Sequence, residues 1–332
     1  MKNILVTGAD GFIGSHLVEL LTKEGFNVNA FCFYNSNNSW GWLDNLEVEI
    51  KQNINVCLGD IRDPTCVKLA MKNCDTVFHL AALIAIPYSY VAPSSYIDTN
   101  IKGTLNMLES ARDLEIEKIV HTSTSETYGS AQYVPIDEMH PLVAQSPYAA
   151  SKIGADQLAL SYWRSFQTPV SILRPFNTYG PRQSARAVIP TIITQLANNK
   201  KDIKLGSTTP TRDFNYVDDT CEAFLEVAKS DKTVGRVVNS ASKFEISIGE
   251  VAYLIAEVMD KEINLVTDSL RIRPEDSEVN RLYGDNHLIK ELTNWIPKFS
   301  GKAGFKKGIF KTINWFLNDS NIEMYKFNEY NV

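Results

Sequence analysis

The sequence predicts an α/β fold in which a Rossmann-like, doubly wound parallel sheet is joined to a smaller α/β lobe. The chain opens on a strand that runs directly into a glycine-rich turn and a helix, and short apolar runs then alternate with amphipathic segments of helical length. Strands that alternate with helices form a parallel sheet with right-handed crossovers. The predicted strands are 3–7, 27–33, 55–58, 76–80, 118–122 and 170–174.

The regular alternation ends near Arg174, and this divides the chain into a first domain at 1–175 and a second lobe at 176–332. Beyond that point loops with proline and glycine become more frequent. Helical patterns are still present there at 188–198, 217–230, 248–258 and 305–317. We expect the second lobe to be the smaller of the two.

Composition excludes several classes of protein. The 332 residues have a formal net charge of −6 with both signs interspersed, so no basic stripe is available for nucleic acid. The uncharged run 76–97 contains His79 and prolines, which favours a buried strand followed by a loop over a membrane span. The start of the chain lacks the apolar segment of a signal peptide, so a cytoplasmic location is expected. The five cysteines contain no Cys-x-x-Cys pair, which argues against a metal site.

The first strand is followed by three glycines at the spacing of a dinucleotide-binding turn. Gly8 permits the tight turn, Gly11 lets the backbone approach a pyrophosphate, and Gly14 allows the helix to pack on the strand. Phe12 and Ile13 belong to the turn before the predicted helix 15–23, whose positive end can bind the anion. The strand, turn and helix together predict a bound nicotinamide dinucleotide.

The next two strand ends are predicted to bind the adenosine half. The second strand ends in Tyr34, Asn35 and Ser36, where the usual acidic ligand of the ribose 2′-hydroxyl is missing. No arginine stands there to attract a 2′-phosphate either, so the choice between NAD and NADP stays open. Asp60 and Ile61, after the third strand, are placed to meet the adenine, although a helix N-terminal cap is the alternative.

The fourth strand is followed by Ala81 and Ala82, which are small where the backbone would pass the nicotinamide half. His79 at the end of this strand has no neighbour in sequence that suits a catalytic base. We interpret it as a hydrogen-bonded core histidine.

Tyr148 and Lys152 stand one helical turn apart and therefore share a helix face. An ammonium near a phenol favours the phenolate, so Lys152 is expected to lower the tyrosine pKa from about 10 towards neutrality. Such a tyrosine can act as a base on a hydroxyl group. The alternative is an ordinary pair on the protein surface.

Polar residues also follow the fifth strand, at Thr124, Ser125 and Glu126. Ligands of parallel sheets bind beyond the carboxyl ends of the strands, so these side chains are predicted to face the nicotinamide. Serine and threonine are common in turns and carry little information by themselves. Glu126 is more informative, because a carboxylate here can remove a proton from a carbon next to a ketone.

Three motifs resemble the extended short-chain dehydrogenase/reductase superfamily. They are Thr-Gly-x-x-Gly-Phe-Ile-Gly at 7–14, Tyr-x-x-x-Lys at 148–152 and Arg-Pro-Phe-Asn-Thr-Tyr-Gly-Pro at 174–181. The resemblance covers nearly the whole chain. It implies a Rossmann fold, a tightly bound NAD or NADP that is regenerated in each cycle, and no metal.

Within that superfamily, Ser-Thr-Ser-Glu at 123–126 resembles the nucleotide-sugar 4,6-dehydratases, especially the GDP-mannose type, which has Thr-Ser-Glu. The dTDP-glucose type has Thr-Asp-Glu, so Ser125 departs from it and puts a carboxylic general acid in doubt. The segments 34–36, 40–43 and 211–214 are similar to the GDP-N-acetylglucosamine 4,6-dehydratases of legionaminic acid biosynthesis.

The resemblance implies a role for each catalytic residue. Tyr148 would take the proton of the sugar 4-hydroxyl, Thr124 would hydrogen-bond that oxygen, and Lys152 would hold the nicotinamide ribose. Glu126 would then remove the proton at C5. Either Ser125, through water, or Glu126 would protonate the leaving 6-hydroxyl.

The resemblance also implies the partners of the chain. Asn177, Arg212 and Arg273 match positions that hold the nucleotide diphosphate, and Glu275 or Asp276 is expected to hold a ribose. A homodimer is implied as well. Helices 93–113 and 147–166 carry apolar residues on more than one side and would form its four-helix interface, unless the second lobe covers them.

Two other functions stay open at this point. A nucleotide-sugar 4-epimerase also oxidises C4, but it does not need a base such as Glu126 for C5. A non-catalytic sensor or scaffold that binds the cofactor is the alternative of another class, and intact Thr124, Tyr148 and Lys152 argue against it.

Overall fold

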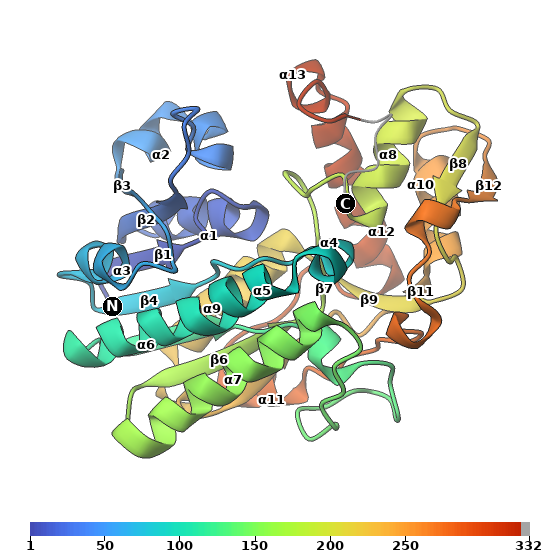
Figure 1. Ribbon diagram of the computed structural model, residues 1–332. Helices are drawn as coiled ribbons and strands as arrows, with labels where there is room; N and C mark the ends of the chain where they lie inside the picture. The colour runs from blue at the N-terminus through green and yellow to red at the C-terminus, as the bar shows by residue number, and fades with distance from the viewer. Residues whose placement is uncertain (327–332) are drawn as a thin grey trace.

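A wholly parallel seven-stranded sheet forms the centre of the protein (Figure 1), as a computed structural model that describes residues 1–326 shows. The strand order is β10-β6-β5-β4-β1-β2-β3, so the direction of winding reverses between β1 and β4. A ligand-binding crevice forms at such a reversal. The predicted doubly wound fold is confirmed. The strands are β1 Asn3–Thr7, β2 Asn27–Phe33, β3 Ile54–Gly59, β4 Thr76–His79, β5 Lys118–Thr122, β6 Val170–Pro175 and β10 Val237–Ser240.

The seventh strand was not predicted from the sequence. β10 pairs in parallel with β6, with Val237 opposite Ile172. The four residues of β10 contain only two apolar side chains, too few to produce a periodic signal. Because β10 comes from beyond residue 175, part of the second half of the chain returns to the sheet, and the division at residue 175 stays a prediction.

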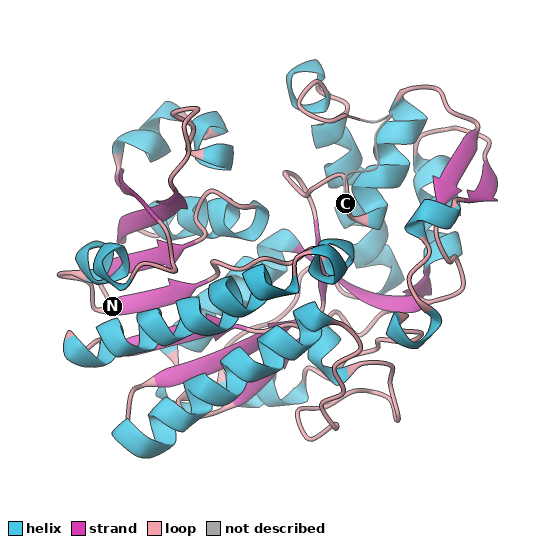
Figure 2. Cartoon of the chain, in the orientation of Figure 1, coloured by secondary structure: helices cyan, strands magenta, loops and turns pink. Residues whose placement is uncertain are grey.

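Helices cover both faces of the sheet (Figure 2). On one face α6 packs between α3 and α7, and on the other α1 packs against α9, which also contacts β5 and β6. These helices are α1 Phe12–Lys23, α3 Pro64–Met71, α6 Gly103–Asp113, α7 Pro147–Phe166 and α9 Val217–Lys229. Helix α1 begins three residues earlier than the glycine spacing suggested.

The uncharged run 76–97 is more helical than expected. It begins with β4, but α4 (Ile86–Val91) follows where a loop was predicted, and α5 (Pro93–Tyr96) lies at the start of the helix predicted at 93–113. Within residues 1–326, no helix has both the length and the apolar character that crossing a bilayer requires.

The helix predicted at 93–113 is not regular. Between α5 and α6 the backbone forms a π-helical segment at Ile97–Lys102. Such wide turns are rare in proteins, and those that occur are often found at functional sites. Asn100 lies in this segment, and its side-chain amide binds the backbone N–H and C=O of Leu83 and the hydroxyl of Ser151. The irregular turn thereby fixes the loop after β4 to α7.

The second lobe consists of helices around two small sheets (right side of Figure 1). One sheet has the order β11-β9-β7 and the other pairs β12 with β8. The strands are β7 Asn177–Tyr179, β8 Asp202–Leu205, β9 Thr211–Tyr216, β11 Glu245–Ser247 and β12 Asn264–Thr267. The helices of this lobe are α8 Val188–Ala197, α10 Ile248–Val258, α12 Gly301–Phe316 and α13 Asp319–Ile322. Two further helices lie beside the central sheet: α2 Val48–Gln52 contacts α1, and α11 His287–Leu292 contacts β10.

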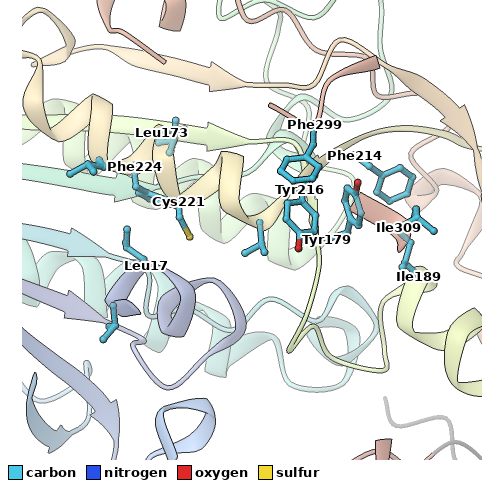
Figure 3. Packing of buried hydrophobic residues seen from close by; sticks show 14 of the residues in the cluster. Leu17, Leu173, Tyr179, Ile189, Phe214, Tyr216, Cys221, Phe224, Phe299 and Ile309 are labelled. Atoms are coloured by element: carbon cyan, nitrogen blue, oxygen red, sulfur yellow. The ribbon is translucent and has the colours of Figure 1, made fainter. Parts of the chain in front are cut away.

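The two lobes share one hydrophobic core. Figure 3 shows Leu17 of α1 and Phe224 of α9 in the same cluster as Tyr216 and Phe214 of β9 and Phe299. The rings of Tyr216 and Phe299 lie 4.2 Å apart between centroids. Burial of each such side chain stabilises the fold by about 1.5–3 kcal/mol. This continuous packing holds the second lobe in a fixed position over the sheet edge.

Candidate active site

The turn after β1 fits a dinucleotide. Gly8 has a φ of +68°, and a Cβ there would lie 2.9 Å from the backbone of Ala81. A Cβ on Gly14 would lie 2.0 Å from the carbonyl oxygen of Gly8, so both positions require glycine. A Cβ on Gly11 would meet only that same oxygen, at 3.3 Å. Internal packing therefore explains Gly8 and Gly14, whereas Gly11 leaves space beside the turn for a ligand.

Helix α1 begins at this turn with Phe12 and Ile13. Gly11 is its N-cap residue, and no side chain caps the helix. The first N–H groups of a helix lack partners within the helix and attract anions. The turn and the start of α1 can therefore hold the pyrophosphate of NAD or NADP, as predicted.

The residues directly after β2, at 34–36, carry no charged group. The side chain of Tyr34 is 67% exposed, and Ser36 is exposed as well. The amide of Asn35 is used within the loop, because it donates to the carbonyl of Ser39 and accepts from the N–H of Asn37. The predicted site residues of this loop thus face solvent or stabilise the loop itself.

The loop after β3 contains the two residues predicted to meet adenine. Ile61 is buried, whereas Asp60 forms an ion pair with Arg62 at 2.5 Å. The alternative that Asp60 caps the next helix is wrong, since Asp63 accepts hydrogen bonds from Thr65 and Cys66 at the start of α3. The charge of Asp60 is therefore balanced at the edge of the crevice.

The residues after β4 contact the glycine turn. The backbone N–H of Ala81 donates to the Thr7 hydroxyl, and Ala82 follows it in the same half-buried loop. His79 bonds through Nδ1 to Thr7 and through Nε2 to Thr104, at 2.9 and 3.1 Å. Burial lowers its pKa well below the ordinary value. The interpretation of His79 as a hydrogen-bonded core residue is confirmed.

Tyr148 and Lys152 lie in the first two turns of α7, which Ser146 caps by accepting from the N–H of Ala149. Both side chains are buried, with exposed fractions of 6% and 4%, so the alternative of a surface pair is wrong. The ammonium of Lys152 donates to the carbonyl of Thr122 at 2.5 Å. That bond ties the helix to the carboxyl end of β5.

The prediction that Lys152 lowers the pKa of Tyr148 is wrong for the chain without a bound ligand. Burial raises the pKa of Tyr148 above its ordinary value, and a hydrogen bond with Thr124 opposes this only in part. Burial also lowers the pKa of Lys152 to about 8. Removing both groups from water has a larger effect here than their proximity along the helix.

A buried polar cluster that sequence reasoning missed lies one turn further along α7. The carboxylate of Asp156 accepts from the hydroxyl of Ser123 at 2.6 Å and from Arg174 at 2.8 Å. His121 lies 3.3 Å from its other oxygen. Burial alone would raise the pKa of Asp156, but these neighbours hold it at about 2. The signal in the sequence is that Asp156 follows Lys152 at helical spacing.

The predicted hydroxyls and carboxylate at the end of β5 lie in the same site. Thr124 accepts from the N–H of Glu126 and begins a short 3₁₀-helix at Ser125–Tyr128. Ser125 and Glu126 are buried, at 2% and 8% exposed. Burial has the largest effect on both neighbours, since it raises the pKa of Tyr148 and lowers that of Arg212, and the negative charge of Glu126 also acts on both groups. The carboxylate is therefore within electrostatic range of the phenol and of the second lobe.

Two arginines of the second lobe converge on one carboxylate. Arg212 donates to Glu278 at 3.3 Å, and Arg273 lies 3.7 Å from the same oxygen. The buried Nη1 of Arg273 has no hydrogen-bond partner, and neither has the buried amide oxygen of Asn177. Burial lowers the pKa of Arg212, and the charge of Arg273 lowers it further. Two repelling cations that share one anion favour binding of a diphosphate.

Glu275 was predicted beside these arginines. It is exposed in the 3₁₀-helix Glu275–Ser277, and the carboxylate that the arginines contact belongs to Glu278. In residues 1–326, no group of three or more histidine, cysteine, aspartate or glutamate side chains could hold a metal ion.

Comparisons with known proteins show relatives of two kinds. The chain is 34% identical to a dTDP-D-glucose 4,6-dehydratase of Homo sapiens, over 97% of this chain and 93% of that protein. It is also 34% identical to a putative UDP-glucose 4-epimerase of Methanocaldococcus jannaschii, over 96% and 99% of the two chains. A solved dTDP-glucose 4,6-dehydratase of Bacillus anthracis in complex with NAD superposes with a TM-score of 0.83 at 28% identity, over 96% and 98% of the two chains.

The profile of one family, described as GDP-mannose 4,6 dehydratase, matches residues 5–308. That match includes the glycine turn, the end of β5, the first turns of α7 and both arginines of the second lobe. Because the profile spans most of the chain, and because both relatives align with nearly its whole length, this chain belongs to the GDP-mannose 4,6-dehydratase family.

Proposed function

We propose that the chain is a nucleotide-sugar 4,6-dehydratase, which converts a nucleoside diphosphate hexose into its 4-keto-6-deoxy derivative and water. The observation that carries the proposal is the buried carboxylate of Glu126, whose charge acts on both Tyr148 and Arg212. Oxidation at C4 alone needs no such group. A base is needed once a ketone at C4 has made the C5 proton acidic.

The residues divide the chemistry between them. Tyr148 takes the proton of the 4-hydroxyl, and Thr124, which hydrogen-bonds Tyr148, orients that oxygen. Glu126 removes the proton at C5, and the C6–O bond breaks as the 6-hydroxyl is protonated and leaves as water. Of the two protons removed, one leaves in that water and the other returns to C5, so the reaction balances.

The dinucleotide supplies the redox chemistry: when bound as NAD, it would accept a hydride from C4 and return it to C6. Use of NAD is supported by the fit of the glycine turn and by the NAD complex of the B. anthracis relative. Lys152 has the remaining task of holding positive charge beside the phenol, which its pKa of about 8 permits at neutral pH.

Which protein group protonates the leaving oxygen depends on position 125. Ser125 carries a hydroxyl and no carboxylic acid, so it can transfer a proton only as a relay through water. Glu126 can return the proton that it has just taken from C5. We infer that Glu126 is the donor, because the hydroxyl of Ser125 has a pKa far from neutrality.

For the substrate, GDP-N-acetylglucosamine is our best candidate. The support is the resemblance of segments 34–36, 40–43 and 211–214 to dehydratases that act on this sugar. Arg212, Arg273 and Asn177 suit the diphosphate of any nucleotide. We propose that Glu275 binds a ribose hydroxyl from its exposed position.

A labelled substrate tests the proposal. GDP-, UDP- and dTDP-hexoses that carry deuterium at C4 are incubated with the protein and analysed by mass spectrometry and NMR. A dehydratase loses about 18 mass units, the mass of one water, and the deuterium appears at C6. Retention of mass with inverted configuration and deuterium at C4 would instead identify the 4-epimerase, which the M. jannaschii relative makes the second candidate. No turnover of any sugar would favour the sensor or scaffold.

We also infer a homodimer through α6 and α7. These helices pack side by side on one face of the sheet (Figure 1). Ile97, in the π-helical segment that leads into α6, and Phe166, the last residue of α7, are 50% and 51% exposed. Light scattering should give twice the mass of the chain, and Ile97→Arg should give a monomer. A monomeric wild type would contradict this inference. The cytoplasmic location stays a prediction.

A further inference from the structure

The loop after β2 leaves open how the ribose of the adenosine half is held. In dinucleotide folds a carboxylate at the end of this strand usually accepts hydrogen bonds from the ribose hydroxyls. Here the strand ends at Phe33, and the loop that follows begins with Tyr34, Asn35 and Ser36, none of which is acidic. The preceding residue, Cys32, is buried. The strand itself therefore supplies no such ligand.

A carboxylate reaches this position from the neighbouring turn. The Oδ2 atom of Asp10 accepts a hydrogen bond from the backbone N–H of Phe33 at 3.3 Å. The turn is joined to the strand along its length, because the N–H groups of Gly8 and Ala9 donate to the carbonyl of Phe31 at 3.1 and 3.3 Å. The side chain of Asp10 is thus held at the carboxyl end of β2.

The loop 34–45 is folded against the same aspartate. The N–H of Trp42 donates to the backbone carbonyl of Asp10 at 3.1 Å. Gly41 has a φ of +58°, and a Cβ there would lie 2.6 Å from that carbonyl oxygen. The backbone of Asp10 is therefore fixed from two sides, and its half-buried side chain has little freedom to move away from β2.

Backbone N–H groups, and no cationic side chain, oppose the effect of burial on the Asp10 carboxyl in the part of the chain that the structure describes. No lysine or arginine contributes to its titration within residues 1–326. Burial raises its pKa, and the backbone N–H groups of Phe33 and of Asp10 itself oppose that effect. Burial and then the charge of Asp10 also raise the pKa of the Cys32 thiol, so the carboxylate lies close to the strand residue that precedes Phe33.

We propose that the carboxylate of Asp10 accepts a hydrogen bond from the 2′-hydroxyl of the adenosine ribose. This contact would make the chain bind NAD in preference to NADP. A hydroxyl can donate to the carboxylate, whereas a 2′-phosphate would place a second anion against it without a nearby cation. In this chain the acidic ligand of the ribose would come from the turn after β1 and not from the end of β2. This explains why no acidic residue stands at 34–36. This inference rests on the dinucleotide use of the proposed function but not on the sugar chemistry.

Direct binding measurements test the inference without any sugar substrate. Nucleotide released from the denatured wild type is identified by mass spectrometry, and the Kd values of nucleotide-free protein for NAD, NADP and 2′-deoxy-NAD are measured by calorimetry. The test variant is Asp10→Asn, which keeps the size of the side chain and an acceptor for the N–H of Phe33. The control is Asp44→Asn. It removes a carboxylate from the neighbouring loop 34–45, where Asp44 accepts a hydrogen bond from the hydroxyl of Ser39.

The wild type should hold NAD and bind NADP more weakly. Asp10→Asn should weaken NAD binding, because a charge-assisted hydrogen bond is lost. It should also reduce the ratio of the Kd for NADP to the Kd for NAD by about tenfold or more, because the repulsion between Asp10 and the 2′-phosphate is lost as well. Asp44→Asn should leave the ratio unchanged. In the wild type, 2′-deoxy-NAD should bind about as weakly as NAD binds to Asp10→Asn.

Three outcomes would overturn the inference: a wild type that prefers NADP, an unchanged ratio in Asp10→Asn, or equal binding of NAD and 2′-deoxy-NAD by the wild type. The last measurement needs no variant and remains decisive if Asp10→Asn does not fold. An equal effect of Asp44→Asn would also contradict it, since general repulsion in the loop would then suffice. Because the readout is affinity, the result is independent of whether the chain is a dehydratase or an epimerase.

Discussion

Both Nε and Nη2 of Arg174 donate to the same carboxylate oxygen of Asp156, at 3.2 and 2.8 Å, and both side chains are almost entirely shielded from solvent. Asp156 is on α7, which carries the proposed base, and Arg174 is on β6. The guanidinium also lies 4.9 Å from the ring centroid of Tyr128, in the segment that carries Glu126. One ion pair thus connects the helix of Tyr148 with the strand-end segment of Glu126.

Breaking this pair should destabilise the fold strongly. Arg174→Met leaves a buried, uncompensated carboxylate and should lower the free energy of unfolding by about 3–5 kcal/mol. The double variant Asp156→Leu with Arg174→Met removes both charges and should be less destabilised than the sum of the two single variants. Urea unfolding followed by fluorescence measures all four proteins. Additive losses would mean that the two side chains do not interact.

The low pKa of Asp156 predicts a specific loss of stability in acid. Its folded pKa of about 2 lies below the ordinary value of 3.8, so its contribution is complete above about pH 4 and is lost as the pH falls through 2. The loss should be about 2 kcal/mol. Unfolding free energies at pH 5, 4, 3 and 2.5 check this, with Asp156→Asn as the control in which this part of the decline is absent. Parallel curves for the two proteins would contradict it.

Much of the fold follows from local patterns in the sequence. The helix at 147–166 has the predicted bounds, because a serine cap and a proline mark its start. The strand at 118–122 is also as predicted, since a short apolar run at a buried position is unambiguous once helices flank it. β10 could not be predicted in this way, because its placement depends on pairing with β6, which precedes it by more than sixty residues.

In the candidate site, too, local patterns in the sequence predicted nearby residues but not contacts between distant ones. Local spacing identified Gly8, Gly11, Tyr148 and Lys152, since each motif lies within one turn or one helix. It did not identify Asp10 as a neighbour of β2, because that contact joins residues 23 positions apart. The predicted direction of the Tyr148 pKa shift was wrong for a related reason. Burial depends on the whole fold and outweighs the nearby ammonium.

The pKa of Lys152 predicts an alkaline limit to activity. The ammonium is present below about pH 8 and is lost above it, so kcat/KM should fall as the pH passes that value. Burial raises the pKa of Tyr148 above its ordinary value, so ionisation of the phenol would raise activity only at higher pH and cannot produce the fall. Lys152→Arg should move the limit beyond pH 10, since a guanidinium stays charged. Circular dichroism at each pH serves as the control for folding, and a wild-type kcat/KM that still rises at pH 10 would contradict the assignment.

Arg273 should contribute to nucleotide binding through its buried Nη1 atom, which lies 3.7 Å from Glu278 but makes no hydrogen bond. Arg273→Ala should weaken GDP binding by about 10- to 100-fold, as expected for loss of a hydrogen bond to a charged group, and should affect guanosine much less. Calorimetry gives both affinities. Arg281→Ala is the matched control, because Arg281 forms a bidentate ion pair with Glu245. Equal losses in the two variants would indicate a general effect of positive charge.

Glu126→Gln should separate the oxidation of C4 from the elimination of water. The glutamine keeps the size and an acceptor but cannot take a proton, so the 4-ketone should form once per bound cofactor while turnover to the 6-deoxy product falls by about 10²- to 10⁴-fold. Absorbance at 340 nm follows the reduced nicotinamide, and mass spectrometry follows the loss of water. Ser125→Ala is the companion variant. If Glu126 alone delivers the proton to the leaving oxygen, Ser125→Ala retains most of its turnover. An equal loss in both variants would assign that proton to a relay through Ser125, and full turnover of Glu126→Gln would exclude Glu126 as the base.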